Sequence, residues 1–90
     1  MSEHDYNDTV DRFLEERCCF IALGIEPVNE LFDQFKEWCA DLEIHPRMVQ
    51  NFSSAVIRRE GVYFDIQPYK GHYRRVFVGI SANRYVCRVA

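Results

Sequence analysis

Residues 46–80 read PRMVQNFSSAVIRREGVYFDIQPYKGHYRRVFVGI, and the spacing of the apolar residues changes within this stretch. In the first part they recur every three or four positions, which is typical of one face of a helix. In the second part they alternate with polar residues, which is typical of a strand. Pro46 can occupy the first position of a helix, and Gly61 can follow the end of one. The stretch therefore predicts a helix from about residue 46 to about 59, followed by a β-hairpin.

The predicted helix has an apolar and a polar face. The apolar face consists of Met48, Val49, Phe52, Ala55 and Val56. The polar face consists of Arg47, Gln50, Asn51, Ser54 and Arg58. The polar face carries no acidic residue, and side chains of these types can reach phosphates and base edges from a helix in the major groove. These five polar residues are therefore candidate DNA contacts.

The alternating part predicts two strands that meet at a turn. Their apolar residues are Val62, Phe64, Ile66, Val76, Val78 and Ile80. Residues 68–72, PYKGH, contain the proline and glycine that favour a turn. The side chains at or beside this turn that can carry positive charge are Lys70, His72, Arg74 and Arg75. Because no core position calls for them there, we expect them to be exposed and to contact the phosphate backbone of DNA.

Two further helices are predicted upstream. The first runs from about residue 8 to about 19, and the second begins at Pro27 and continues to about residue 42. The apolar face of the second helix consists of Val28, Leu31, Phe32, Phe35, Trp38, Cys39 and Leu42. This pattern favours a core position for Trp38. A weaker alternation over residues 83–89 predicts either an additional strand or a packed tail.

Charge is divided unevenly along the chain. Residues 1–45 contain three basic and twelve acidic residues, a formal charge of −9, whereas residues 46–90 contain eight basic and two acidic residues, a formal charge of +6. Binding to a polyanion depends on the local field of one face more than on the net charge. The second half is therefore where DNA would bind, unless the charges of the two halves pair across the fold.

Three helices followed by a basic hairpin are the order of a winged helix-turn-helix, an α+β fold. In that fold the third helix enters the major groove and the hairpin reaches the neighbouring backbone or minor groove. The length of 90 residues predicts one domain over residues 1–90, with a core at about 8–81 and a tail or extra strand at 82–90. Because winged helices also dock onto proteins, a protein-docking module is the alternative to a DNA-binding one.

Other classes of function have little support in the sequence. Neither a serine elbow nor a phosphate-binding loop is present, so no catalytic residue is predicted. The histidines and the four cysteines lack metal-ligand spacing, so we expect no metal and no cofactor. Cys39 and one of Cys18 or Cys19 are expected to be reduced core residues. The chain has no apolar run long enough to cross a membrane and no signal-peptide pattern, so we expect no membrane partner and a cytoplasmic protein.

Several short motifs together suggest a family. They are residues 13–18 (FLEERC), the spacing of Val28, Leu31, Phe32, Phe35, Trp38 and Cys39, the pair Phe52 and Val56, and the closing Val78-Gly79-Ile80. These motifs resemble the carboxy-terminal winged-helix domain of phage and plasmid primase-helicases, which the poxvirus helicase-primase shares. The resemblance covers roughly residues 10–81. Phe32 and Phe35 stand where that family usually has tyrosine.

The resemblance implies a DNA-binding accessory domain attached to an AAA+ helicase, in proteins that often also carry a primase. The matching core positions are Phe13, Leu31, Trp38, Phe52 and Ile80, and Arg74 and Arg75 match the basic hairpin by location. No catalytic residue carries over. The expected partners are duplex or forked DNA, and either the helicase domain of the same polypeptide or a replication protein. The alternatives are a docking module that recruits a replication partner and a stand-alone phage transcriptional regulator, which would normally be a dimer.

Overall fold

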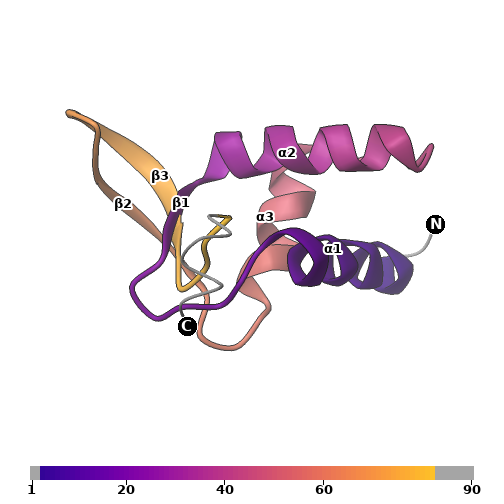
Figure 1. The fold of residues 1–90 in the computed structure, drawn as a ribbon, viewed down its shortest axis with the longest axis horizontal. Helices are drawn as coiled ribbons and strands as arrows, with labels where there is room; N and C mark the ends of the chain where they lie inside the picture. The colour runs from indigo at the N-terminus through magenta and orange to yellow at the C-terminus, as the bar shows by residue number, and fades with distance from the viewer. Residues whose placement is uncertain (1–2, 83–90) are drawn as a thin grey trace.

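The computed structural model describes residues 3–82 as a small α+β domain. Its elements are α1 (Glu3–Arg17), β1 (Ile25–Pro27), α2 (Val28–Asp41), α3 (Val49–Ile57), β2 (Tyr63–Tyr69) and β3 (His72–Val78). The strands form one antiparallel sheet in the order β1-β3-β2. The helices lie together on one side of the molecule, and the β2–β3 hairpin extends away from them (Figure 1). The expected α+β class is confirmed, and the tail predicted at residues 83–89 lies outside the described residues.

Aromatic rings from the three helices form the centre of the core. Phe35 of α2 lies 4.7 Å from Phe52 of α3 and 5.2 Å from Phe13 of α1, measured between ring centroids. Trp38 is buried beside them, with its ring 5.6 Å from that of Phe13. Offset and edge-to-face contacts of this kind stabilise a core beyond the apolar area that they bury. The core position expected for Trp38 is therefore confirmed.

The first helix begins at Glu3, earlier than the expected start at about residue 8. Its apolar face extends toward the amino end because Tyr6 lies four residues before Val10 and seven before Phe13, and all three side chains are buried. The hydroxyl of Tyr6 donates a hydrogen bond of 2.8 Å to the carbonyl oxygen of Pro46. Tyr6 thereby attaches the first turns of α1 to the segment that leads into α3.

The third helix is shorter than the predicted range of about 46–59. Arg47 has a φ of 61°, in the left-handed region, so the helix cannot include it. The helix instead begins after Met48, whose backbone N–H donates to Oδ1 of Asn51 at 3.2 Å. This bond satisfies an N–H that the first turn leaves without a helical partner.

The short strand β1 was not predicted from the sequence. It pairs with β3 through Ile25 opposite Val78 and Pro27 opposite Val76. Three residues are too few to display an alternating pattern, and α2 follows directly. Pro27, predicted as the first residue of a helix, is therefore the last residue of a strand.

The predicted hairpin is present, but its turn is tighter than residues 68–72. Tyr69 pairs with His72, so only Lys70 and Gly71 form the turn, with φ values of 50° and 86°. Positive φ at both central residues is the geometry that matches the twist of the flanking strands. The strands therefore reach farther toward the tip than expected, and β3 ends at Val78 before the predicted Ile80.

Successive side chains point to opposite faces of the hairpin. One face, here called the open face, presents exposed side chains beyond the core, namely Phe64, Ile66, Pro68, Tyr73 and Arg75. At its base Phe77 is buried, 6.1 Å from the ring of Phe52. The opposite face carries Asp65, Gln67 and Arg74, which are partly buried. The hairpin is thus joined to the helices at one end and exposes apolar residues at the other.

Cys39 and one of Cys18 or Cys19 were expected to be reduced core residues. Cys39 is buried and Cys18 packs against the core, and both are free, as predicted. Burial raises the pKa of the Cys18 thiol to about 12 and that of Cys39 to about 11, so both thiols stay protonated at neutral pH. Cys19 is disulfide-bonded, so Cys18 is the reduced core residue of the adjacent pair.

Candidate nucleic-acid interface

One hollow lies on each side of α3. The α1-side hollow, of about 460 Å³, is lined by Tyr6, Asn7, Arg47, Asn51, Ser54 and Arg58. The sheet-side hollow, of about 430 Å³, is lined by Val28, Asn29, Val49, Gln50, Ser53, Phe64 and Arg75. Four of the five polar residues predicted as DNA contacts on the third helix therefore lie around one hollow. Gln50 lies in the other, together with Arg75 of the hairpin.

Arg47 is held in a defined position at the edge of the α1-side hollow. Its backbone N–H donates to Nδ1 of His45 at 3.0 Å, and its guanidinium lies 4.5 Å from the centre of the Tyr6 ring. The Tyr6 pKa is raised to about 12, chiefly by burial and secondarily by Cys39, while Arg47 lowers it. A non-glycine residue with positive φ costs about 1–3 kcal/mol and is common where a side chain must be positioned for function.

Asn51 and Ser54 supply hydrogen-bonding groups between the two arginines. Oδ1 of Asn51 accepts the Met48 N–H and so caps α3. The amide NH₂ of Asn51 takes no part in this bond and can donate to a ligand. Ser54 is exposed one turn farther along the same side of the helix.

The cations at the end of α3 are paired with acids of α1. Arg58 and Arg59 lie 2.7 Å and 3.0 Å from Oδ1 of Asp11, and Arg59 also lies 3.7 Å from Glu15. Burial raises the pKa of Asp11, but the hydrogen bonds and charges of the two arginines outweigh burial and lower it overall. Arg58 therefore lines the hollow while it also binds a carboxylate.

The hairpin cations do not form one cluster. Arg74 pairs with Glu30 of α2 at 3.2 Å, and its guanidinium lies 5.7 Å from the Tyr69 ring. Nζ of Lys70 lies 5.4 Å from the centre of the same ring. Arg75 points to the open face and makes no ion pair within residues 3–82. Adjacent strand residues point to opposite sides, so the expected pair Arg74 and Arg75 is divided between the two faces.

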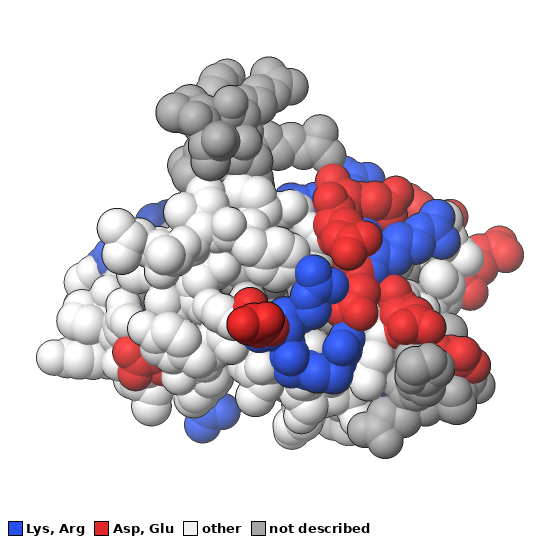
Figure 2. Space-filling model, turned by 90° about the horizontal axis from the view of Figure 1, so that it is seen from below, with Lys and Arg blue, Asp and Glu red and all other residues white. Residues whose placement is uncertain are grey.

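The remaining features of the predicted site are His72, the last of the hairpin contacts, and the distribution of charge on the surface. His72 is exposed at the first position of β3. Seen from below, Lys and Arg side chains lie among Asp and Glu side chains in one band, and most of the remaining face is uncharged (Figure 2). The pairs of Asp11 with Arg58 and of Glu30 with Arg74 join the acidic half of the sequence to the basic half. The basic half therefore does not present all of its cations to a ligand.

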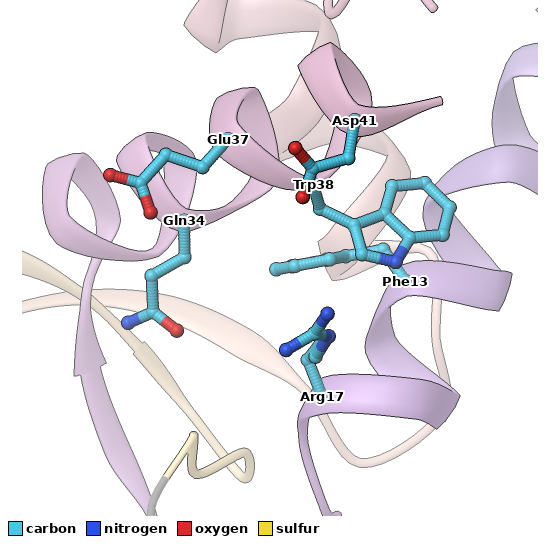
Figure 3. A pocket seen from close by; sticks show the side chains of 6 residues that line it. All are labelled: Phe13, Arg17, Gln34, Glu37, Trp38 and Asp41. Carbon is cyan, nitrogen blue, oxygen red and sulfur yellow. The ribbon is translucent and has the colours of Figure 1, made fainter. Parts of the chain in front are cut away.

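A third hollow, of about 150 Å³, lies between α1 and α2 and has a different character. It is lined by Phe13, Arg17, Gln34, Glu37, Trp38 and Asp41. Figure 3 shows the carboxylates of Glu37 and Asp41 on the α2 side and Arg17 on the α1 side. Two carboxylates against one guanidinium repel a phosphate, so this hollow does not extend the candidate interface.

Sequence reasoning missed several residues that line the two hollows beside α3. Tyr6 could have been found, because it continues the three- and four-residue spacing of Val10 and Phe13 toward the amino end. No comparable spacing in the sequence indicates Asn29, Ser53 or Asn7, the residue that follows Tyr6. Their positions depend on how α1, α2 and the hairpin pack around α3.

Within residues 3–82, no group of His, Cys, Asp and Glu side chains could hold a metal ion. None of the helices in this part of the chain is long and apolar enough to cross a membrane. No family model, curated protein or solved structure matches the chain. The likeness to primase-helicases therefore stands on the sequence motifs alone.

Proposed function

We propose that this chain is a winged-helix DNA-binding domain, in which α3 enters the major groove and the β2–β3 hairpin serves as the wing. The α1-side hollow carries the proposal: among residues 3–82 its lining consists of a tyrosine, two asparagines, two arginines and a serine, with no acidic side chain. These groups suit a phosphate backbone and the edges of bases. Arg47 and Arg58 would contact phosphates, and Asn51 and Ser54 the backbone or base edges.

The fixed position of Arg47 supports this assignment. Its guanidinium lies over a buried tyrosine ring whose hydroxyl is bonded to Pro46. An arginine that is already ordered loses less conformational entropy when it binds a phosphate.

The ion pairs set the expected character of the binding. Arg58 must first separate from Asp11, and Arg74 from Glu30, before either guanidinium can bind a phosphate without competition from a carboxylate. Lys70, His72 and Arg75 would supply the other wing contacts. We therefore expect binding that depends on a small number of phosphate contacts and weakens with salt in proportion to that number.

The family resemblance supplies the biological setting of the proposal. On that basis the domain is an accessory module of a phage- or plasmid-type replicative primase-helicase, acting in the cytoplasm. It would dock on duplex or forked DNA and perform no chemistry itself, while the AAA+ helicase domain or another replication protein would be its protein partner.

The test is the variant Arg47→Gly, assayed by fluorescence anisotropy with a labelled duplex at several salt concentrations. Glycine adopts a φ of 61° without the steric strain that a Cβ causes, so the fold is retained while the guanidinium is lost. We expect weaker binding and a salt slope smaller by about one. Thermal unfolding of the same variant should show no loss of stability.

The matched control is Glu43→Gly, because Glu43 has a φ of 56° in the same connection between α2 and α3. This variant should gain stability for the same backbone reason and should bind DNA at least as well as the wild type. Failure of the wild type to bind duplex at low salt would overturn the proposal. So would equal affinities and salt slopes for the wild type and Arg47→Gly.

A protein-docking winged helix is the second candidate. The observation that favours it is the pairing of Arg58, Arg59 and Arg74 with acids of the same chain, which leaves fewer cations for DNA. This candidate predicts weak DNA binding and a specific partner protein, in line with recruitment of a replication factor. A stand-alone regulator predicts a stable dimer, which sedimentation would reveal.

A further inference from the structure

The open face of the hairpin exposes a continuous apolar strip. The exposed fractions of Phe64, Ile66 and Tyr73 are 43%, 58% and 78%, and Pro68 is also exposed. Pro68 lies opposite Tyr73, and Ile66 lies opposite Arg75, so these side chains are neighbours on one surface. Contiguous apolar surface rimmed by polar groups commonly marks a binding site.

The charge on this face has one sign. Arg75 is its only charged side chain, and it makes no ion pair with any residue from 3 to 82. The single acid of β2 and β3, Asp65, lies on the opposite face, where its carboxylate accepts a hydrogen bond of 2.8 Å from Gln67. The open face therefore suits a ligand that combines apolar surface with negative charge.

The outer edge of β2 is a poor site for an added peptide strand. The backbone N–H of Ile66 donates to Oδ1 of its neighbour Asp65 at 2.8 Å, and Pro68 has no N–H to offer. Strand addition needs a row of free donors and acceptors along the edge, and such features blunt it. A ligand of this hairpin is therefore expected on its face and not on its edge.

The strip continues into the sheet-side hollow. Phe64 and Arg75 belong to both, and Gln50 and Ser53 of α3 line the hollow beside them. DNA that lies along α3 would therefore reach the open face. A duplex directs phosphates outward and keeps its bases stacked inside, so apolar side chains gain little from it. An unpaired strand offers base faces to aromatic rings and phosphates to an arginine.

We propose that the open face binds unpaired bases at a junction between double- and single-stranded DNA. Bases stack on Tyr73 and Phe64, and Arg75 holds an adjacent phosphate. This assignment rests on the proposed DNA-binding function and deepens it, because it gives the wing a preference for forked over fully paired DNA.

The experiment compares Tyr73→Ala with a control variant, Tyr63→Ala. The control removes a tyrosine that is 55% exposed and lies on the opposite face of the hairpin. Anisotropy is measured with a blunt duplex, the same duplex with unpaired arms, and an oligo-dT strand. Stacking on one aromatic side chain changes the affinity for single strands by about fivefold to one hundredfold. Tyr73→Ala should therefore lose at least about fivefold in affinity for forked DNA and oligo-dT, with duplex binding unchanged. Tyr73→Phe, which keeps the ring, should restore wild-type affinity.

Each other outcome overturns the assignment. Equal binding of fork and duplex by the wild type excludes a preference for unpaired bases, although duplex binding would still support the function of α3. Equal losses for Tyr73→Ala on fork and duplex indicate a backbone contact in place of stacking. If Tyr73→Ala abolishes self-association in sedimentation and leaves fork binding unchanged, the strip is a protein interface. If the wild type binds no duplex at all, the proposed function itself fails.

Discussion

Phe52 of α3 and Phe64 of β2 illustrate two different regions of this molecule. Phe52 is buried, and its ring lies within 6.3 Å of the rings of Phe13, Phe32, Phe35 and Phe77. Phe64 is 43% exposed and lies on the open face of the hairpin. Both occupy apolar positions of a regular sequence pattern. Rings from α1, α2 and β3 surround the first residue, whereas the second lies at the sheet-side hollow, near residues of α2 and α3, and remains open to solvent.

The difference separates residues that stabilise the fold from residues that are available for binding. Packing against two other helices buries the centre of the apolar face of α3, namely Phe52, Ala55 and Val56, and the aromatic cluster is the result. A hairpin that extends beyond the helices buries only its base. Its outer apolar side chains contribute little to the folded state, and a function that uses them would explain their exposure.

The largest expected effect tests this separation directly with two matched substitutions. Phe52→Ala removes a ring from the centre of the cluster and should lower the free energy of unfolding by about 3–5 kcal/mol. Phe64→Ala should lower it by less than about 1 kcal/mol, because much of that side chain already contacts solvent. Urea unfolding followed by circular dichroism measures both. Similar losses would show that the hairpin is as much a part of the core as α3 is.

The next effect concerns the joint between the hairpin and the helices. Gly79 follows β3 with a φ of 99°, and a Cβ at this position would overlap the carbonyl oxygen of Gly61. Gly61 has a similar φ of 83°, but a Cβ there would meet no atom within 4 Å. Gly61→Ala should therefore cost only the backbone strain, about 1–2 kcal/mol. Gly79→Ala should cost about 2–4 kcal/mol, because the close approach adds to the strain.

Thermal unfolding of the two glycine variants measures this difference. The shared positive φ cancels in the comparison, so the remainder reports the contact between residues 61 and 79. Equal losses of stability would mean that this close approach does not hold the hairpin to the helices.

The sequence predicted the parts of the fold that local spacing determines. The stripe of α2 predicted the buried Phe35 and Trp38, and the change of period at Gly61 predicted the hairpin. Strand β1 was missed because three residues carry no period. The left-handed conformation of Arg47 was missed because nothing in its residue type indicates a positive φ. In the structure, this conformation occurs together with the hydrogen bond to His45 and the contact with the Tyr6 ring.

The candidate site was predictable in composition and less so in arrangement. The helical wheel placed Arg47, Asn51, Ser54 and Arg58 on one side, and they line one hollow. It also placed Gln50 there, but the neighbouring elements divide the surface of α3 into two hollows. The ion pair of Arg74 with Glu30 joins residues 44 positions apart, and no local pattern encodes it.

The smallest expected effect concerns the ion pairs between α1 and the end of α3. Asp11→Asn removes the carboxylate that lies 2.7 Å from Arg58 and 3.0 Å from Arg59. Because these side chains are partly exposed, the loss of stability at neutral pH should be about 0.5–1 kcal/mol. Asp33→Asn is the control, since within residues 3–82 Asp33 pairs only with Lys36 of the same helix and both side chains are exposed. It should change stability by less than Asp11→Asn.

The pH dependence gives Asp11→Asn a second readout. The arginines lower the pKa of Asp11 in the folded chain, so its contribution is present above the pKa of the unfolded chain, about 4. It disappears as the pH falls through the lower folded value, because protonation then removes the charge in both states. The stability difference between wild type and Asp11→Asn should therefore shrink in acid. The same variant releases Arg58 and Arg59, so it should bind duplex DNA more tightly while it is less stable. A variant that lost both stability and affinity would indicate that Asp11 holds Arg58 in its binding position and does not compete with DNA for it.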